Sequence, residues 1–153
     1  QPSLAPDGGA EKKLMKNRIT CYSAGQQLPG IHFFILSKGL NAGKPLDAAC
    51  PNCFVFSCKS KEERDKYFWI CYGLWQSNHF RVHLVGSVIP FLRKSELVML
   101  VDQADSIVRF EGDKFWNQVR LLSEFHEMSN RVKNHLAYLE MTKRAAVAKI
   151  IAL

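Results

Sequence analysis

Two cysteines form the most specific chemical motif in the sequence. Cys50 and Cys53 are separated by Pro51 and Asn52, and a Cys-x-x-Cys turn of this kind can direct two thiolates at a zinc ion or close a redox pair. A structural zinc site needs four ligands, and the chain has no second Cys-x-x-Cys pair. The favoured interpretation is a pair of structural thiols, and zinc binding and redox chemistry are the alternatives.

The other cysteines do not extend this motif. In a strand over residues 54–58, Cys58 falls on the face opposite to Cys53. Cys71 falls on the apolar face of a predicted helix, where cysteine acts as a small hydrophobic residue. Five cysteines are an odd number in a chain without an export signal, so we expect no disulfide framework.

Enzymatic motifs are not apparent in the sequence. The stretch His-Glu-Met-Ser-Asn at 126–130 begins like a zinc-protease helix, but Asn130 stands where the second histidine belongs. Gly39 and Gly43 lack the spacing of a phosphate-binding loop. We therefore predict a protein that is not an enzyme, with no catalytic residues, no metal ligands and no cofactor.

A basic cluster follows in the middle of the chain. Its members lie within seventeen residues, and they are Asn78, His79, Arg81, His83, Arg93 and Lys94. Arginine can bond guanine through two hydrogen bonds, asparagine can do the same with adenine, and lysine can hold phosphate. A solvated polar face is the commoner explanation for any one such residue. The cluster predicts a DNA-binding surface made of Asn78, Arg81, His83, Arg93 and Lys94.

Composition is compatible with a polyanionic partner. The chain has 153 residues, 47% of them hydrophobic, which is enough for one core. Its 21 Lys and Arg residues exceed its 14 Asp and Glu residues, and the net charge is +7. No apolar run is long enough to span a membrane, and residues 1–14 lack the apolar core of a signal peptide. We expect a soluble cytoplasmic protein without membrane contacts.

Periodicity predicts an α+β fold. Apolar runs predict strands at 31–36, 54–58, 80–85 and 97–101. The segment 60–76 has helical spacing, and Ser60 with Glu63 forms a possible capping box. We expect a small mixed sheet with this aromatic helix packed on it. The predicted organisation is a flexible leader at 1–14, a domain at 15–112, and a long helix at 113–153.

The last 41 residues contain neither proline nor glycine. Their apolar residues recur every three or four positions with one gap of seven, which fits one long amphipathic helix or two helices joined without a breaker. A single unbroken helix would be roughly 60 Å long. Such a helix is longer than the domain before it, so part of its apolar stripe must meet a partner. We predict a homodimer in which the helices contact each other, through Leu122, Val132, Leu136 and Leu139.

The stretch DKYFWICYGLWQSNHFRVHLVGSVIPFLRKSELVMLV, residues 65–101, resembles the closing half of a target-recognition domain from the DNA-specificity subunit of type I restriction-modification systems. The shared order is a tyrosine-rich helix, a strand, a Gly-Ser-x-Ile-Pro-like turn, a polar turn and a final apolar strand. Those parts correspond to 67–74, 80–85, 86–90, 93–96 and 97–101. The long helix that follows is similar to the spacer helix of those subunits.

This resemblance implies DNA recognition, pairing of two chains, and a methyltransferase-type subunit as a further partner. It also implies that Gly86, Ser87 and Pro90 form a corner leading into the last strand. The segment GKPLDAACPNCF is outside the pattern and looks more like an uncharacterised bacterial family of short proteins. We therefore expect a non-catalytic DNA-binding module, and the alternative is an interaction or adaptor protein that binds no DNA.

Overall fold

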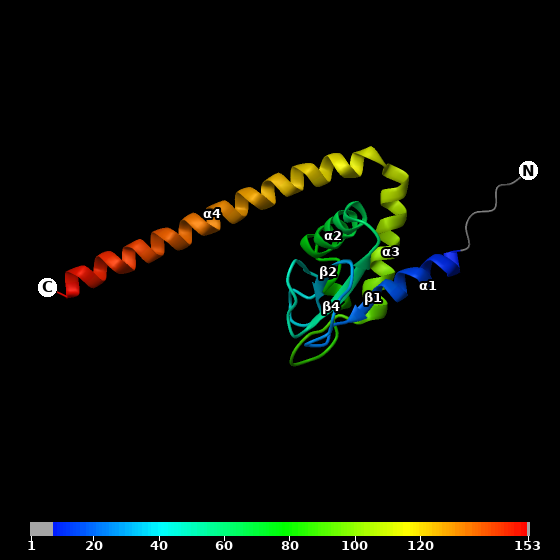
Figure 1. Ribbon diagram of the computed structural model, residues 1–153, viewed down its shortest axis with the longest axis horizontal. Coiled ribbons are helices and arrows are strands. Elements are labelled where there is room, and N and C mark those ends of the chain that lie inside the picture. The colour runs from blue at the N-terminus through cyan, green and yellow to red at the C-terminus, as the bar shows by residue number, and fades with distance from the viewer. Residues whose placement is uncertain (1–7, 153) are drawn as a thin grey trace, which may run out of the picture. The chain divides into compact units, whose positions relative to one another are not determined.

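The computed structural model describes residues 8–152 and divides the chain into two compact units (Figure 1). The first unit ends at Phe110, and the second begins at Glu111. Of the predicted flexible leader, residues 1–7 lie outside the described residues. Residues 8–14 belong to the helix α1 (Gly8–Arg18) instead, because the helix after its two initial glycines consists largely of good helix formers such as Ala, Glu, Lys, Leu and Met.

A four-stranded sheet forms the centre of the first unit. Its strands are β1 (Ile19–Cys21), β2 (Ile31–Leu36), β3 (Pro45–Leu46) and β4 (Cys53–Cys58), in the order β1-β4-β2-β3. All three pairs of neighbours are antiparallel, so the expectation of a mixed sheet is wrong. The strands predicted at 31–36 and 54–58 are confirmed, and they form the two central strands of an α+β fold.

The helix α2 (Lys61–Gln76) begins where the sequence predicts. The Ser60 hydroxyl accepts a hydrogen bond from the Glu63 N–H at 3.1 Å, as in a capping box. The Glu63 carboxylate accepts a bond from the N–H of Lys59 at 2.6 Å, one residue before the usual partner. Both bonds satisfy N–H groups at or just before the start of the helix, and they fix where α2 starts.

Aromatic rings join α2 to the sheet. The helix lies over β2 and β4 (Figure 1). Phe33 and Phe56 stack with their ring centroids 5.0 Å apart, and Phe56 stacks on Tyr67 at 4.9 Å. All three side chains are buried, and Phe33 and Phe56 are completely excluded from solvent. This aromatic stack is the core of the first unit.

The strand predicted at 80–85 is wrong. A 3-10 turn, η1 (Arg81–His83), takes its place. The alternation of Phe80, Val82 and Leu84 predicted one buried face, but Val82 is 81% exposed. The N–H groups of Arg81 and His83 bond to the carbonyls of Asn78 and Phe80, so the segment satisfies its backbone locally and needs no neighbouring strand.

The strand predicted at 97–101 is also wrong, because these residues lie in the first two turns of the helix α3 (Lys94–Glu111). The buried residues of this helix include Leu97, Val98, Val101 and Asp105, which are spaced at intervals of one, three and four positions. That spacing places them on one helical face. A five-residue apolar run fits a strand and a buried helix equally well, and the sequence interpretation chose the wrong one.

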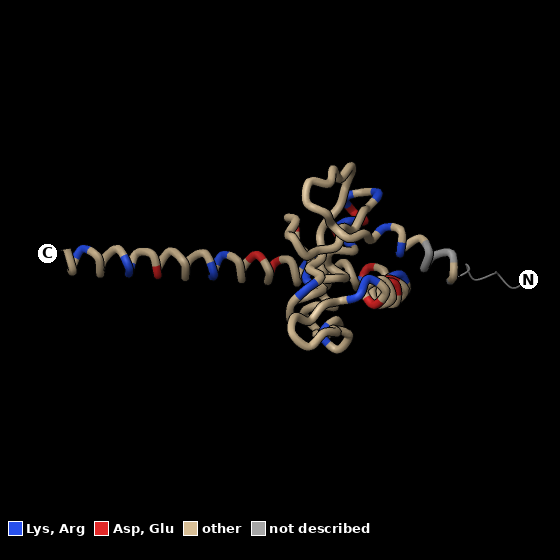
Figure 2. The backbone as a smooth tube through the Cα atoms, turned by 90° about the horizontal axis from the view of Figure 1, so that it is seen from below, with Lys and Arg blue, Asp and Glu red and all other residues tan. Residues whose placement is uncertain are grey.

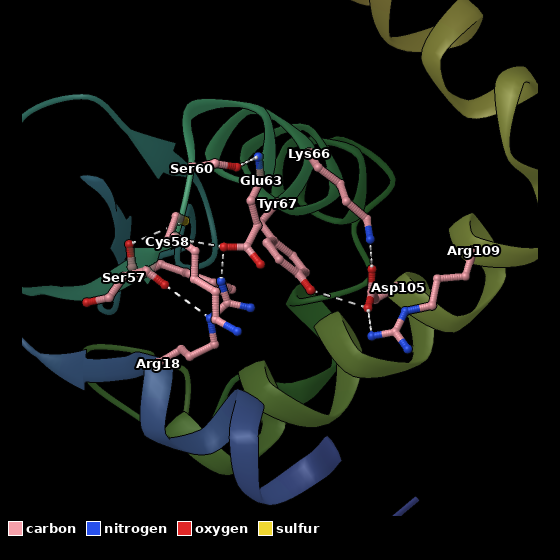
Figure 3. A network of polar contacts seen from close by, with 11 residues as sticks. Arg18, Ser57, Cys58, Ser60, Glu63, Lys66, Tyr67, Asp105 and Arg109 are labelled. Atoms are coloured by element: carbon pink, nitrogen blue, oxygen red, sulfur yellow. Dashed lines mark hydrogen bonds and ion pairs between the residues drawn. The ribbon is translucent and has the colours of Figure 1, made fainter. Parts of the chain in front are cut away.

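Buried charges connect α2 with α3. Asp105 is 2% exposed, and its carboxylate accepts a hydrogen bond from the Tyr67 hydroxyl at 3.3 Å. Lys66 and Arg109 form ion pairs with the same carboxylate, at 2.5 and 2.8 Å (Figure 3). A buried carboxylate needs such partners, because desolvation would otherwise destabilise its charge. The contacts from Tyr67 and Lys66 on α2 hold α3 against α2, whereas the Arg109 pair lies within α3.

A second polar group connects α1 with α2. The Arg18 guanidinium pairs with Glu63 and donates from Nε to the carbonyl of Ser57 at 3.2 Å (Figure 3). It also lies over the rings of Phe56 and Tyr67, with the guanidinium carbon 5.6 and 5.1 Å from their centroids. The arginine therefore lies over the aromatic core while its charge is paired.

The second unit consists of the helix α4 (Asp113–Ile151), which has 39 residues. The predicted long helix is confirmed and continuous, with a length of about 58 Å. Gly112, with φ +50°, precedes it and separates it from α3 along the chain. Among the described residues, no helix combines the length and the apolar character that a membrane span requires.

Candidate nucleic-acid interface

Three segments that are distant in the sequence form one surface, which we call the loop surface. They are residues 37–44, 75–83 and 85–94. Backbone hydrogen bonds join the first to the third: the Gly39 N–H donates to the Pro90 carbonyl at 2.7 Å, and the Leu92 N–H donates to the Ser37 carbonyl at 2.9 Å. These bonds bring Lys38 beside Phe91.

A close contact joins residues 37–44 to residues 75–83. Phe80 is 1% exposed, and its ring packs directly on Gly43. A Cβ atom at residue 43 would lie 2.1 Å from Cδ2 of Phe80, and Gly43 has φ +98°. Only glycine tolerates this positive φ and leaves room for the Phe80 ring. Gly43, which the sequence did not place in a phosphate-binding loop, therefore has a packing role.

Asn78 occupies the turn that ends α2. Its N–H donates to the Trp75 carbonyl at 3.0 Å, and the N–H of His79 donates to the Leu74 carbonyl at 2.9 Å. With φ +60° at Asn78, this is a Schellman motif. Asparagine tolerates this left-handed conformation, so the backbone of Asn78 has a structural reason and its exposed side chain stays free for a ligand.

A cavity of about 300 Å³ opens between the first two segments. Its lining brings together two of the predicted site residues, Asn78 and Arg81, with Asn41, Gln76 and Trp75. The Gln76 Nε2 already donates to the Tyr72 hydroxyl at 3.0 Å, which leaves its carbonyl oxygen for a ligand. With the amides of Asn41 and Asn78, the indole of Trp75 and the guanidinium of Arg81, the cavity can supply hydrogen bonds, stacking and positive charge. The surroundings thus suit a planar polar group such as a nucleobase edge.

Sequence reasoning missed Lys44 and Trp75. The Lys44 Nζ lies 5.1 Å from the centre of the Trp75 ring. These residues are 31 positions apart, and no local pattern connects them. The only signal was the pair of glycines at 39 and 43, which marks a loop that approaches other backbone closely.

The remaining predicted residues, His83, Arg93 and Lys94, do not line this cavity. His83 pairs with Glu96, with Nδ1 and Oε2 3.0 Å apart, which makes it the least available of the five for DNA. Arg93 is exposed directly before α3, and Lys94 is the first residue of that helix. A cation is electrostatically unfavourable at a helix N-terminus, whereas an anion such as phosphate is favourable there.

The loop surface is poor in acidic groups. No acidic residue occurs between Asp65 and Glu96. Within residues 8–152, no carboxylate forms an ion pair with the basic side chains of this surface, which are Lys38, Lys44, Arg81, Arg93 and Lys94. Figure 2 shows that basic residues occur in both units. Lys16, Lys59 and Lys61 form no ion pair with a described carboxylate either, so it is the absence of acidic residues from 66 to 95 that distinguishes this surface.

The thiols lie in apolar surroundings. Cys53 packs with Phe34 and Val55 in a buried cluster, Cys50 packs against it, and the Cys53 thiol donates to the Cys50 carbonyl at 3.0 Å. Burial raises the pKa of the Cys53 thiol, and burial raises that of Cys58 to about 11. Thiols with raised pKa values are protonated at neutral pH, and a protonated thiol is a poor nucleophile and a poor metal ligand. In the described part of the chain, no three potential metal ligands lie together.

These features define an α+β protein with a basic, amide-containing loop surface and a long amphipathic helix. The chain belongs to a family of unknown function, DUF6943, whose family model matches residues 19–149. No curated protein and no solved structure matches it. The likeness to type I specificity subunits stays a prediction, and two of the strands on which it was based are wrong.

Proposed function

We propose that this protein is a non-catalytic DNA-binding module that acts in the cytoplasm as a homodimer. The observation that carries the proposal is the loop surface, where Arg81, Arg93 and Lys94 lie with Lys38 and Lys44 and have no acidic partners among the described residues. Unpaired cations repel one another, and a phosphate backbone relieves that repulsion while it releases counterions. A surface of this composition suits a polyanion.

The amide groups favour nucleic acid over a simple anion. Asn41, Gln76 and Asn78 line the cavity beside Arg81. Amide side chains can donate and accept hydrogen bonds at once, which matches the edges of bases and is not needed for phosphate alone. We therefore assign backbone contacts to the basic residues and base contacts to the cavity.

Dimerisation is proposed from the surface of α4. Large apolar side chains along this helix are exposed in the single chain, and they include Leu122, Phe125, Val132, Leu136 and Leu139. A continuous apolar stripe on a single helix normally marks an interface. A second copy presents the same stripe with the same length, which makes a pair of α4 helices the simplest closed assembly.

The test is DNA binding by a triple variant, Arg81→Ala with Arg93→Ala and Lys94→Ala. Binding to random duplexes would be measured from about 50 to 200 mM salt. If these residues contact phosphates, the affinity falls and the slope of log affinity against log salt decreases by about 1 for each lost contact.

A matched control removes three charges elsewhere. Lys16, Lys59 and Lys61 are exposed, and Lys59 and Lys61 flank the N-terminal end of α2, opposite to the loop surface. Their triple replacement by alanine lowers the net charge equally and should leave the slope closer to that of the wild type. Equal effects of both triple variants would show that only net charge matters, and absence of binding by the wild type at low salt would refute the proposal.

Exposed apolar side chains favour a second candidate, an adaptor that binds another protein. Leu40, Val82 and Val88 are exposed on or beside the loop surface, at 62, 81 and 90%. Apolar groups of this kind often mark protein interfaces. A stable complex with a purified cellular protein, formed by a chain with no affinity for duplex DNA, would establish this alternative.

A further inference from the structure

The loop from Gly86 to Pro90 is held at its base. Val85 and Phe91 exchange two backbone hydrogen bonds, of 3.0 and 2.8 Å, and these bonds close the loop. Gly86 has φ +104°, and a Cβ atom there would lie 2.8 Å from the Ile89 carbonyl oxygen. The bond from Gly39 to Pro90 anchors the far end of the loop. The closing bonds therefore define the position of the tip before any ligand arrives.

That tip presents apolar groups to solvent. Val88 is 90% exposed and Ile89 is 63% exposed. Apolar surface in water is unfavourable, and the core of the unit buries residues of the same types, such as Ile19 and Val55, almost completely. Val82 and Ile107 are exposed too, but as single side chains, whereas Val88 and Ile89 are neighbours at one loop tip. Neither the fold of the loop nor its closing bonds require a branched apolar side chain at position 88 or 89. Contact with a partner outside the unit therefore explains the choice of Val88 and Ile89 better.

The tip is flanked by cations. Phe91, which closes the loop, pairs with Lys38 across the bridge, and Arg93 follows two residues later. The sequence from 66 to 95 contains no acidic residue. The apolar tip therefore approaches any polyanion together with basic groups, and it does so as part of the surface that carries the proposed function.

We propose that the loop 86–90 is an apolar wedge, which inserts Val88 and Ile89 between base pairs of duplex DNA and bends the duplex. This inference rests on the proposed DNA binding and adds the mode of binding. Proteins that insert such side chains into the minor groove unstack a base step and kink the duplex by roughly 20 to 90°. Flanking cations hold the phosphates on either side of the opened step.

A lipid surface is the other apolar partner that basic groups attract, and two observations favour DNA. The tip offers only two large apolar side chains, and a weak anchor of this size needs help from other contacts. The neighbouring cavity is lined with Asn41, Gln76 and Asn78, whose amides match base edges and have no comparable use in a bilayer.

The experiment compares the full-length wild type with the double variant Val88→Ala, Ile89→Ala. The duplex has about 30 base pairs, a central TA step and dyes at both ends, because such pyrimidine–purine steps are the easiest to kink. Energy transfer between the dyes reports bending, and 2-aminopurine placed at the central step reports unstacking. The matched control is Ile107→Ala on α3, where the isoleucine is also 63% exposed.

We expect the wild type and Ile107→Ala to increase energy transfer and 2-aminopurine fluorescence, whereas the double variant binds with an unchanged salt slope and bends much less. Both 88 and 89 are exposed, so the variant should keep the thermal unfolding temperature of the wild type. A wild type that binds DNA without bending it would overturn the wedge and leave the proposed function intact. A wild type that binds anionic phosphatidylserine vesicles through 88 and 89, and no DNA, would overturn both.

Discussion

Gly43 is the residue on which the geometry of the loop surface depends most directly. Gly43→Ala would place a methyl group 2.1 Å from Cδ2 of the Phe80 ring, far closer than van der Waals contact, and would force an alanine into φ +98°. We expect a loss of about 2–4 kcal/mol in the free energy of unfolding, from the left-handed conformation together with overpacking. Urea unfolding followed by tryptophan fluorescence measures this loss.

The control at this scale is Gly73→Ala. Gly73 lies inside α2, and no neighbouring atom lies within 4 Å of the position that its Cβ would take. Alanine is there expected to stabilise the protein by up to about 1 kcal/mol, because it favours the helix. Destabilisation of similar size at both glycines would contradict the argument from Phe80.

At this residue scale, the sequence identified part of the site. Asn78 and Arg81 do line one cavity, and Arg93 and Lys94 belong to the same surface. Trp75 and Lys44 were missed because their contact joins residues 31 positions apart. Side chains that meet only after the chain has folded leave no local pattern, whereas a cluster within seventeen residues does.

The sequence predicted helices correctly where the apolar pattern was long or where a capping box marked the start of the helix. The capped segment 60–76 and the long segment 113–153 both form helices, with ends within two residues of those expected. The errors at 80–85 and 97–101 came from runs of five or six residues, in which alternation or an apolar run was taken for a strand. The turn at Asn78 and the buried carboxylate of Asp105, which set these segments apart from strands, depend on tertiary contacts.

The connection between α1 and α2 predicts a dependence of stability on pH. Burial raises the pKa of Glu63, but the Lys59 N–H and the Arg18 guanidinium outweigh this effect and lower it below its ordinary value of 4.5. A lowered pKa in the folded state contributes stability at neutral pH, and that contribution is lost as the pH falls below about 4.5. Glu63→Gln should therefore lose about 1–3 kcal/mol at pH 7.

Urea unfolding between pH 7 and pH 3 measures this effect, since the difference between wild type and Glu63→Gln should shrink as the wild-type carboxylate is protonated. Glu62 is the control, because it lies in the same first turn of α2 and is exposed. Glu62→Gln should change stability little at any pH. A constant gap between Glu63→Gln and the wild type would contradict the role of the carboxylate charge.

At the scale of the whole molecule, the sequence predicted that the apolar stripe of α4 contacts a partner. Leu136→Glu with Leu139→Glu introduces two charges on the stripe, at side chains that are 59 and 62% exposed. We expect a dimeric wild type and a monomeric variant, because the charges would be desolvated in the interface. Light scattering after size-exclusion chromatography measures the mass.

The paired control is Tyr138→Glu with Met141→Glu. These side chains have the same spacing and nearly the same exposure, 64 and 62%, but lie on the opposite side of the helix at about 100° per residue. They should leave the dimer intact. A monomeric wild type would exclude pairing through α4, and loss of the dimer in both double variants would show that α4 tolerates no added charge.

The packing of Phe80 on Gly43 has a consequence for how a ligand can be found. The two residues are 37 positions apart, so the loop surface exists only while the first unit is folded. A ligand that binds the folded chain alone is linked to the unfolding equilibrium of that unit, and at about 100 times its Kd it adds about 2.7 kcal/mol. Occupancy of this surface is therefore visible as a higher melting temperature, and a thermal melt can rank DNA, RNA and lipid ligands before the natural one is known.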